Sequence, residues 1–157
     1  MRLDLMSEDD FRAYQENEIR EYAEDKIRSG AWSQENAYEL SMQTHRRLLP
    51  EGLATPGQFI FSIRDEDLGQ NVGVIWFARF EEGGKRLAFI YDLIILEQFR
   101  RRGYGTQAML ALEEKVKEVG LDTIALHVFG FNQAALGLYE KVGYEITDIN
   151  MAKTLKD

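Results

Sequence analysis

Apolar residues in the first third of the chain recur at helical spacing. Residues 8–28 place apolar side chains three or four positions apart and predict a helix. Ser7 stands three residues before Asp10, the spacing of a capping box, and is expected to cap that helix. A second helix is predicted over residues 37–49, with Ser33 as its N-cap. The N-terminal third is therefore expected to be mainly helical.

Runs rich in β-branched and aromatic residues predict the strands of a sheet. We expect strands at residues 2–6, 58–63, 71–80, 86–96 and 123–130, one or two more over 144–155, and helices at 103–119 and 132–142. Turn-like segments between the three middle strands predict an antiparallel meander. The predicted fold class is α/β (α+β), with a mixed, mostly antiparallel sheet and helices on both faces.

Composition narrows the class of protein. The 157 residues have the size of one domain, and the formal net charge of −8 argues against nonspecific nucleic-acid binding. The chain has no cysteine, which excludes disulfides, thiolate metal sites and a cysteine nucleophile and fits a reducing compartment. No apolar stretch has the length of a membrane span, so we expect a cytoplasmic protein without membrane contact. The two histidines, His45 and His127, lie far apart, so no metal site is expected; His45, beside two arginines, is interpreted as a surface residue.

A basic, glycine-containing loop between a predicted strand and a predicted helix is the first candidate site. It comprises Arg100, Arg101, Arg102, Gly103, Tyr104, Gly105 and Thr106. Free backbone N–H groups at a helix N-terminus bind anions, arginines add charge-assisted hydrogen bonds, and glycines permit close approach of the backbone. A phosphate site is one interpretation, and a basic turn before a solvated helix is the other. The loop is neither a Walker loop nor a complete dinucleotide fingerprint, since Ala108 stands where the last glycine would be.

A second motif, downstream of the loop, carries a family resemblance. The loop has the pattern Arg100-x-x-Gly103-x-Gly105, and residues 132–144 read Asn-Gln-Ala-Ala-Leu-Gly-Leu-Tyr-Glu-Lys-Val-Gly-Tyr. In this combination the chain resembles the GNAT acyltransferase superfamily over about residues 58–150. The resemblance implies that residues 1–157 form one acetyltransferase domain, in which 58–150 bind acetyl-coenzyme A and 1–57 form a variable helical region on the substrate side.

The resemblance also implies a binding mode for the coenzyme. The pyrophosphate is expected on the backbone N–H groups of residues 101–106. The pantetheine arm is expected along Leu93, Ile94 and Ile95, in the manner of an added strand, with Asn132 on its other side. The strand over residues 89–96 should therefore splay from the strand over 123–129 and leave a slot.

Three residues are candidates for the chemistry. Tyr139 matches the superfamily tyrosine beside the coenzyme sulfur and could protonate the leaving thiolate, although an aromatic at helical spacing is also a core residue. Tyr91 occupies the position at which many relatives carry a glutamate base, and strand alternation predicts that Asp92 faces the opposite side. His127 resembles a histidine that deprotonates the amine through a water, and a structural histidine is the other interpretation.

Three functional hypotheses follow from these residues. The first is an N-acetyltransferase that moves an acetyl group from acetyl-coenzyme A by direct transfer to a primary amine, carried by a small molecule or a peptide. The second is a non-catalytic coenzyme-binding or regulatory domain of the same fold. The third is a nucleotide-binding module that uses the basic loop. A homodimer is kept open as the assembly.

Overall fold

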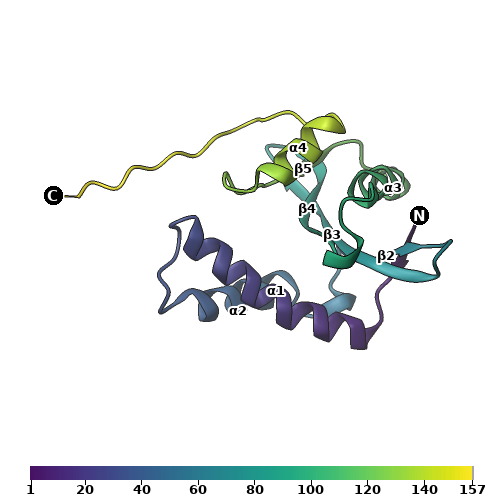
Figure 1. The fold of residues 1–157 in the computed structure, drawn as a ribbon, viewed down its shortest axis with the longest axis horizontal. Coiled ribbons are helices and arrows are strands. Elements are labelled where there is room, and N and C mark those ends of the chain that lie inside the picture. Colours follow the sequence, from purple (N-terminus) through teal and green to yellow (C-terminus); the bar gives the residue numbers. More distant parts are fainter. Residues whose placement is uncertain (157) are drawn as a thin grey trace.

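The computed structural model describes residues 1–156 and shows one sheet between two groups of helices (Figure 1). The strands are β1 (Arg2–Leu5), β2 (Gln58–Asp65), β3 (Gln70–Glu82), β4 (Lys85–Ile95) and β5 (Ile124–Leu126). The helices are α1 (Glu8–Arg28), α2 (Ala37–Leu48), α3 (Tyr104–Glu118) and α4 (Gln133–Lys141), with short 3-10 turns at Gly52–Ala54 and Glu97–Phe99.

The five strands lie in the order β1-β2-β3-β4-β5. The first four pair antiparallel, whereas β5 pairs parallel to β4. This confirms the predicted mixed, mostly antiparallel sheet. The pairing of β4 with β5 runs only from Ala88–Ile124 to Ile90–Leu126, so the strands separate beyond this point and leave the expected slot.

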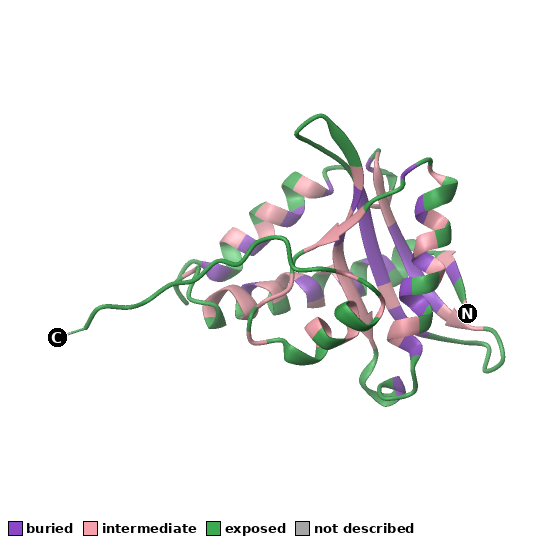
Figure 2. Ribbon diagram, turned by 90° about the horizontal axis from the view of Figure 1, so that it is seen from above, coloured by how far each residue is buried: buried purple, intermediate pink, exposed green. Residues whose placement is uncertain are grey.

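The two faces of the sheet carry separate hydrophobic clusters. On one face α3 packs through Met109 and Leu112 against residues such as Ile63 and Phe77. On the other face α1 packs through Phe11, together with Tyr14, against Trp76. The helices therefore cover both faces, as predicted, and Figure 2 shows the buried residues concentrated on the central strands.

The ends of the N-terminal helices test the capping predictions. Ser7 Oγ accepts a hydrogen bond from the backbone N–H of Asp10 at 3.2 Å, and α1 has the predicted bounds. The cap of α2 is different, because the residue before its first turn is Asn36 and not Ser33. Asn36 Nδ2 donates to Ser33 Oγ at 3.3 Å, so the predicted cap residue belongs to the turn before the helix.

The interpretation of His45 as a surface residue is wrong. His45 is 3% exposed, and its ring lies 5.6 Å from that of Trp76. Ala37, Ser41 and His45 are the buried residues of α2, at positions i, i+4 and i+8, so they form its inner face. Burial lowers the pKa of His45 and favours its neutral form. The helical spacing from Ala37 and Ser41 indicates the burial of His45, whereas the neighbouring arginines indicated exposure.

The predicted C-terminal strands are also wrong. Within the described part of the chain, residues 142–156 contain neither helix nor strand, and the segment extends away from the body of the molecule (Figures 1 and 2). Ile149 is 70% exposed and Met151 92%. The strand predicted over 123–130 is shortened to β5 because, once it leaves β4, no further strand completes its hydrogen bonds.

Close packing of β3 against β4 yields a stability prediction. A Cβ at Gly73 would lie 2.1 Å from the backbone carbonyl oxygen of Ile94. Gly73→Ala should therefore destabilise the protein by about 1–3 kcal/mol, the usual cost of overpacking. Gly137→Ala is the control, since a Cβ at that position would have no heavy atom within 4 Å and an alanine inside α4 favours the helix. Urea unfolding should show a lower midpoint for the first variant and an equal or higher one for the second.

Candidate active site

A β-bulge in β4 determines which side chains face the substrate-side helices. Trp76 pairs with Asp92 and Phe77 with Ile90, so Tyr91 is an extra residue in β4. Tyr91 packs on Trp76 at 4.8 Å, and Asp92 accepts a hydrogen bond from the hydroxyl of Tyr14 on α1 at 2.7 Å. Tyr91 and Asp92 therefore lie on the same side of the sheet. The expectation that they face opposite sides is wrong, because strand alternation fails at a bulge.

A cavity of about 380 Å³ lies where β4 and β5 separate. It brings together Tyr91 and Leu93 of β4, His127 directly after β5, and two residues of the second motif, Asn132 and Tyr139. The remaining lining residues are Glu18, Tyr22, Asp25, Lys26, Phe89, Ile90, Asp92, Leu126, Val128, Phe129 and Ala135. A second hollow of about 420 Å³ at residues 120–123, Lys85 and Arg86 holds none of the candidate residues.

Tyr139 on α4 lines the cavity. Its ring packs near Tyr144. Burial, with a smaller contribution from the charge of Asp92, raises the pKa of Tyr139 to about 12. The hydroxyl therefore keeps its proton at neutral pH and can donate it to an anion that forms in the cavity.

His127 and Asn132 lie on the β5 side of the cavity. His127 is exposed, its ring stands edge-on to Phe129 at 4.9 Å, and partial burial together with Lys26 lowers its pKa. Its neutral form therefore prevails at pH 7. Asn132 is the N-cap of α4, and its Oδ1 accepts a hydrogen bond from the N–H of Ala135 at 3.2 Å. This cap gives Asn132 a structural role in addition to the predicted contact with the pantetheine arm.

Two carboxyl groups that the sequence analysis did not select, Glu18 and Asp92, line this cavity. Glu18 on α1 is 9% exposed and lines the same cavity as Asp92 of β4. Burial, and then the charge of Asp92, raises the pKa of Glu18, and burial raises the pKa of Asp92. A sequence signal existed, because Glu18 continues the buried face of α1 that carries Phe11 and Tyr14.

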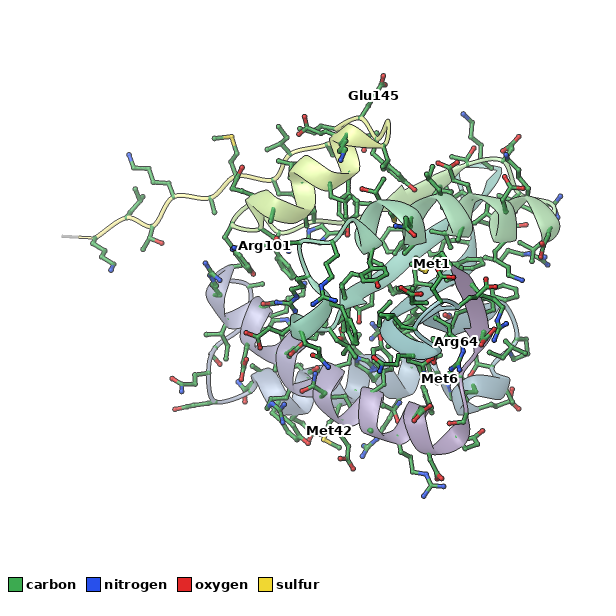
Figure 3. The ribbon with its side chains drawn as sticks, turned by 45° about the vertical axis from the view of Figure 1, so that its right-hand side comes forward. Met1, Met6, Met42, Arg64, Arg101 and Glu145 are labelled. Carbon is green, nitrogen blue, oxygen red and sulfur yellow. The ribbon has the colours of Figure 1, made fainter. Side chains whose placement is uncertain are left out.

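The basic loop follows the 3-10 turn after β4 and leads into the N-terminus of α3; Arg101, which is labelled in Figure 3, belongs to it. Arg101 has φ 64°, the only positive φ of a non-glycine residue in the described part of the chain, and Gly103 follows with φ 80° as the N-cap of α3. The first-turn N–H groups of α3 precede the first helical hydrogen bond, which Gln107 N donates to the carbonyl of Gly103. Arg100 Nε donates to the carbonyl of Ile95 at 2.8 Å, which ties the loop to the end of β4.

Tyr104 and Gly105, which follow the arginines, have packing roles. Tyr104 is 8% exposed, and its hydroxyl donates to the carboxylate of Asp65. A Cβ at Gly105 would lie 3.0 Å from Leu138 on α4, so this glycine lets the two helices approach. Both residues can therefore offer an anion only their backbone, as the sequence analysis expected for residues 101–106.

Comparison with known proteins agrees with this geometry. The sequence profile of the acetyltransferase (GNAT) family matches residues 11–144. The chain belongs to the GNAT acetyltransferase family. It is 38% identical over 152 residues to the uncharacterised N-acetyltransferase YycN of Bacillus subtilis, covering 96% of each chain. It is 33% identical over 153 residues to a second such protein from that organism, YdgE, covering 98% of this chain and 97% of the relative.

Solved structures support the same fold. The crystal structure of YycN superposes with a TM-score of 0.93 at 37% identity and covers 99% of both chains. An aminoglycoside acetyltransferase from an uncultured soil sample, solved with sisomicin, has a TM-score of 0.60 at 19% identity, covering 99% of this chain and 96% of that one. The second likeness concerns the fold alone.

Family membership implies acyl transfer from acetyl-coenzyme A, and the chemistry of the loop fits this cosubstrate. Three consecutive arginines and the N-terminus of a 15-residue helix are suited to a pyrophosphate. In residues 1–156, no helix is long and apolar enough to cross a membrane. The same residues contain no group of three or more histidines and carboxylates that could hold a metal ion.

Arg101 offers a test of the loop that leaves the packing of Gly105 intact. Arg101→Gly removes one cation and also removes a side chain from a left-handed backbone position. If the loop binds the pyrophosphate, affinity for coenzyme A should fall roughly 10- to 100-fold, the value of one charge-assisted hydrogen bond. The melting temperature should not fall, because glycine adopts this φ without strain.

The matched control for this variant is Arg12→Ala, which removes an exposed cation from α1. Calorimetric titration with coenzyme A should give the wild-type affinity for the control. Equal affinities in Arg101→Gly and the wild type would contradict a pyrophosphate site at Arg101.

Proposed function

We propose that this GNAT protein is an N-acetyltransferase that moves an acetyl group from acetyl-coenzyme A directly to a primary amine in the cavity between β4 and β5. The observation that carries the proposal is the position of Tyr139. Its protonated hydroxyl shares one cavity with Tyr91, His127 and Asp92, next to the point where β4 leaves β5. An acid, candidate bases and a slot for an extended arm are thereby assembled in one place.

The coenzyme is proposed to lie along β4 and the loop that follows. Pyrophosphate would contact the backbone N–H groups of residues 101–106 and the side chains of Arg100, Arg101 and Arg102. The pantetheine arm would extend beside Leu93, Ile94 and Ile95, whose backbone pairs with β3 on one edge only. Asn132, at the N-terminus of α4, would contact the arm from the opposite wall.

The transfer requires a neutral amine and a proton for the leaving thiolate. The amine nitrogen attacks the thioester carbonyl carbon, the carbon–sulfur bond breaks, and the hydroxyl of Tyr139 protonates the sulfur. The amine proton can pass to His127 at the rim or to the carboxyls inside the cavity, and both lie among its lining residues. Direct transfer is consistent with the absence of cysteine from the chain.

The second hypothesis, a non-catalytic coenzyme-binding domain, loses its main support. It rested on the expectation that no carboxylate on β4 would face the substrate side. Asp92 lines the cavity because of the bulge at Tyr91, so that argument no longer applies. The nucleotide-binding hypothesis is set aside because it does not account for the match to the acetyltransferase family.

Tyr139→Phe tests the proposed chemistry directly. The substitution removes only the hydroxyl, so turnover should fall about 10²- to 10⁴-fold, while affinity for coenzyme A stays close to the wild-type value. The acceptor should first be found by measuring acetyl-coenzyme A consumption with polyamines, aminoglycosides, amino acids and peptide N-termini. Unchanged turnover in Tyr139→Phe would remove the acid role of this residue.

Tyr38→Phe is the control for this substitution, since Tyr38 is 57% exposed on α2 and lies outside the cavity lining. Its turnover should equal that of the wild type. A wild-type protein that consumes no acetyl-coenzyme A with any of the four acceptor classes would contradict the proposed enzyme.

A further inference from the structure

Glu18 and Asp92 form a carboxyl pair without a cation. Glu18 projects from α1 and Asp92 from the bulged part of β4. The hydroxyl of Tyr14 donates a hydrogen bond to Asp92 Oδ2 at 2.7 Å. Neither carboxyl belongs to an ion pair among residues 1–156. A protein that buries acidic groups normally pairs them, because removal of a charge from water is costly.

The groups around the pair do not supply the missing charge. From α1 the pair faces Tyr14, Glu21 and Asp25, and the charge of Asp92 also acts on Tyr139 of α4. All of these are neutral or acidic, so none of them offsets the cost of ionising the pair as a cation would. Lys26, the one cation of the cavity lining, lies 5.5 Å from the ring of Tyr22 and 5.4 Å from that of Trp32.

The walls of the cavity indicate what kind of cation would fit. Aromatic side chains from three elements line it, namely Tyr22 on α1, Phe89 and Tyr91 on β4 and Phe129 after β5. Such rings bind apolar and aromatic bodies and attract ammonium groups through their faces. A primary ammonium also has three N–H donors, which match the acceptor oxygens of two carboxyls.

We propose that Glu18 and Asp92 bind the primary ammonium group of the acetyl acceptor, that Asp92 takes its proton, and that the acceptor is therefore a cationic amine on an apolar or aromatic body. This inference rests on the proposed acetyltransferase function. It names the acceptor class and a proton acceptor in the interior of the cavity.

In the proposed step Asp92 takes one proton from the acceptor, and Tyr139 gives one to the coenzyme sulfur. A proton passes from the ammonium nitrogen to the carboxylate of Asp92 and leaves a neutral amine. The nitrogen lone pair forms the bond to the thioester carbonyl carbon, the carbon–sulfur bond breaks, and Tyr139 gives its hydroxyl proton to the sulfur. The second amine proton, which the nitrogen loses as the amide forms, returns to the oxygen of Tyr139. The proton on Asp92 is released to solvent after the product leaves.

The binding part of the inference can be tested without the coenzyme. Calorimetric titration should show that 2-phenylethylammonium binds to the full chain and that 2-phenylethanol, its neutral counterpart, does not. Glu18→Gln and Asp92→Asn should each weaken ammonium binding roughly 10- to 100-fold, as expected for a lost hydrogen bond to a charged group. Glu24→Gln, at an exposed position of the same helix, is the control and should bind as the wild type does.

Stability distinguishes a ligand site from a structural pair. The folded-state pKa of Glu18 is raised above its unfolded value, so the pair favours folding below about pH 4 and opposes it as the pH rises above that value. The Glu18→Gln variant should therefore melt at a higher temperature than the wild type at pH 8, with a smaller difference at pH 5. Lower melting temperatures at both pH values, with unchanged ammonium binding, would show that the pair is structural and overturn the proposal.

Turnover completes the test. With an amine found by the screen, Asp92→Asn should lower kcat about 10²- to 10⁴-fold, and Glu18→Gln should mainly raise KM for the amine. Turnover unaffected in both variants would overturn the inference while leaving the acetyltransferase function intact.

The pH–rate profile distinguishes the two candidate proton acceptors. If His127→Gln removes its acidic limb and Asp92→Asn does not, His127 accepts the proton, and the proposed role of Asp92 as proton acceptor is overturned. Tighter binding of spermidine than of 2-phenylethylammonium would overturn the inference that the acceptor has an apolar or aromatic body. A wild-type protein that binds the ammonium but never consumes acetyl-coenzyme A would contradict the proposed function alone.

Discussion

The extra residue at Tyr91 in β4 is the constraint on which the rest of the site depends. One edge of β4 pairs antiparallel with β3 on both sides of Tyr91. The pairing continues past the extra residue only because β4 forms a bulge there. The bulge brings Tyr91 and Asp92 to the same side of the sheet and follows directly after the last residue pair that joins β4 to β5. Strand separation and the placement of a carboxyl in the cavity therefore occur at one point in the chain.

The cavity then requires a wall from outside the sheet, which α1 supplies. This helix is anchored through Phe11 and Tyr14 against Trp76, and the same face continues to Glu18 and Tyr22. A carboxyl at Glu18 is costly to bury, whereas an apolar residue there would have added to the core. An ionisable residue at a buried position of an otherwise well-packed helix is the pattern expected where binding, and not stability, determines the residue.

Much of the fold was accessible from the sequence because local rules decide it. Helix α1 was predicted with its observed bounds, and the meander of β2, β3 and β4 was recognised from runs of strand-forming residues. Predictions failed where a distant partner decides the outcome. His45 is buried because α2 packs against α1 and the sheet, and residues 144–155 contain apolar residues at strand-like spacing but form no strand. The helical period of α2 indicates that His45 faces inward, but neighbouring residues in the sequence do not show that residues 144–155 lack a strand partner.

The same division applies to the site. The sequence by itself determined the basic loop, the helix that starts near Asn132 and the candidate Tyr139, because each belongs to a contiguous motif. It also determined the family, which the comparison confirms. Only the tertiary structure decided that Glu18 and Asp92 line one cavity, since 73 intervening residues separate them in the chain. The orientation of Asp92 was likewise decided by pairing with β3, because a bulge is a property of two strands and cannot be seen in one.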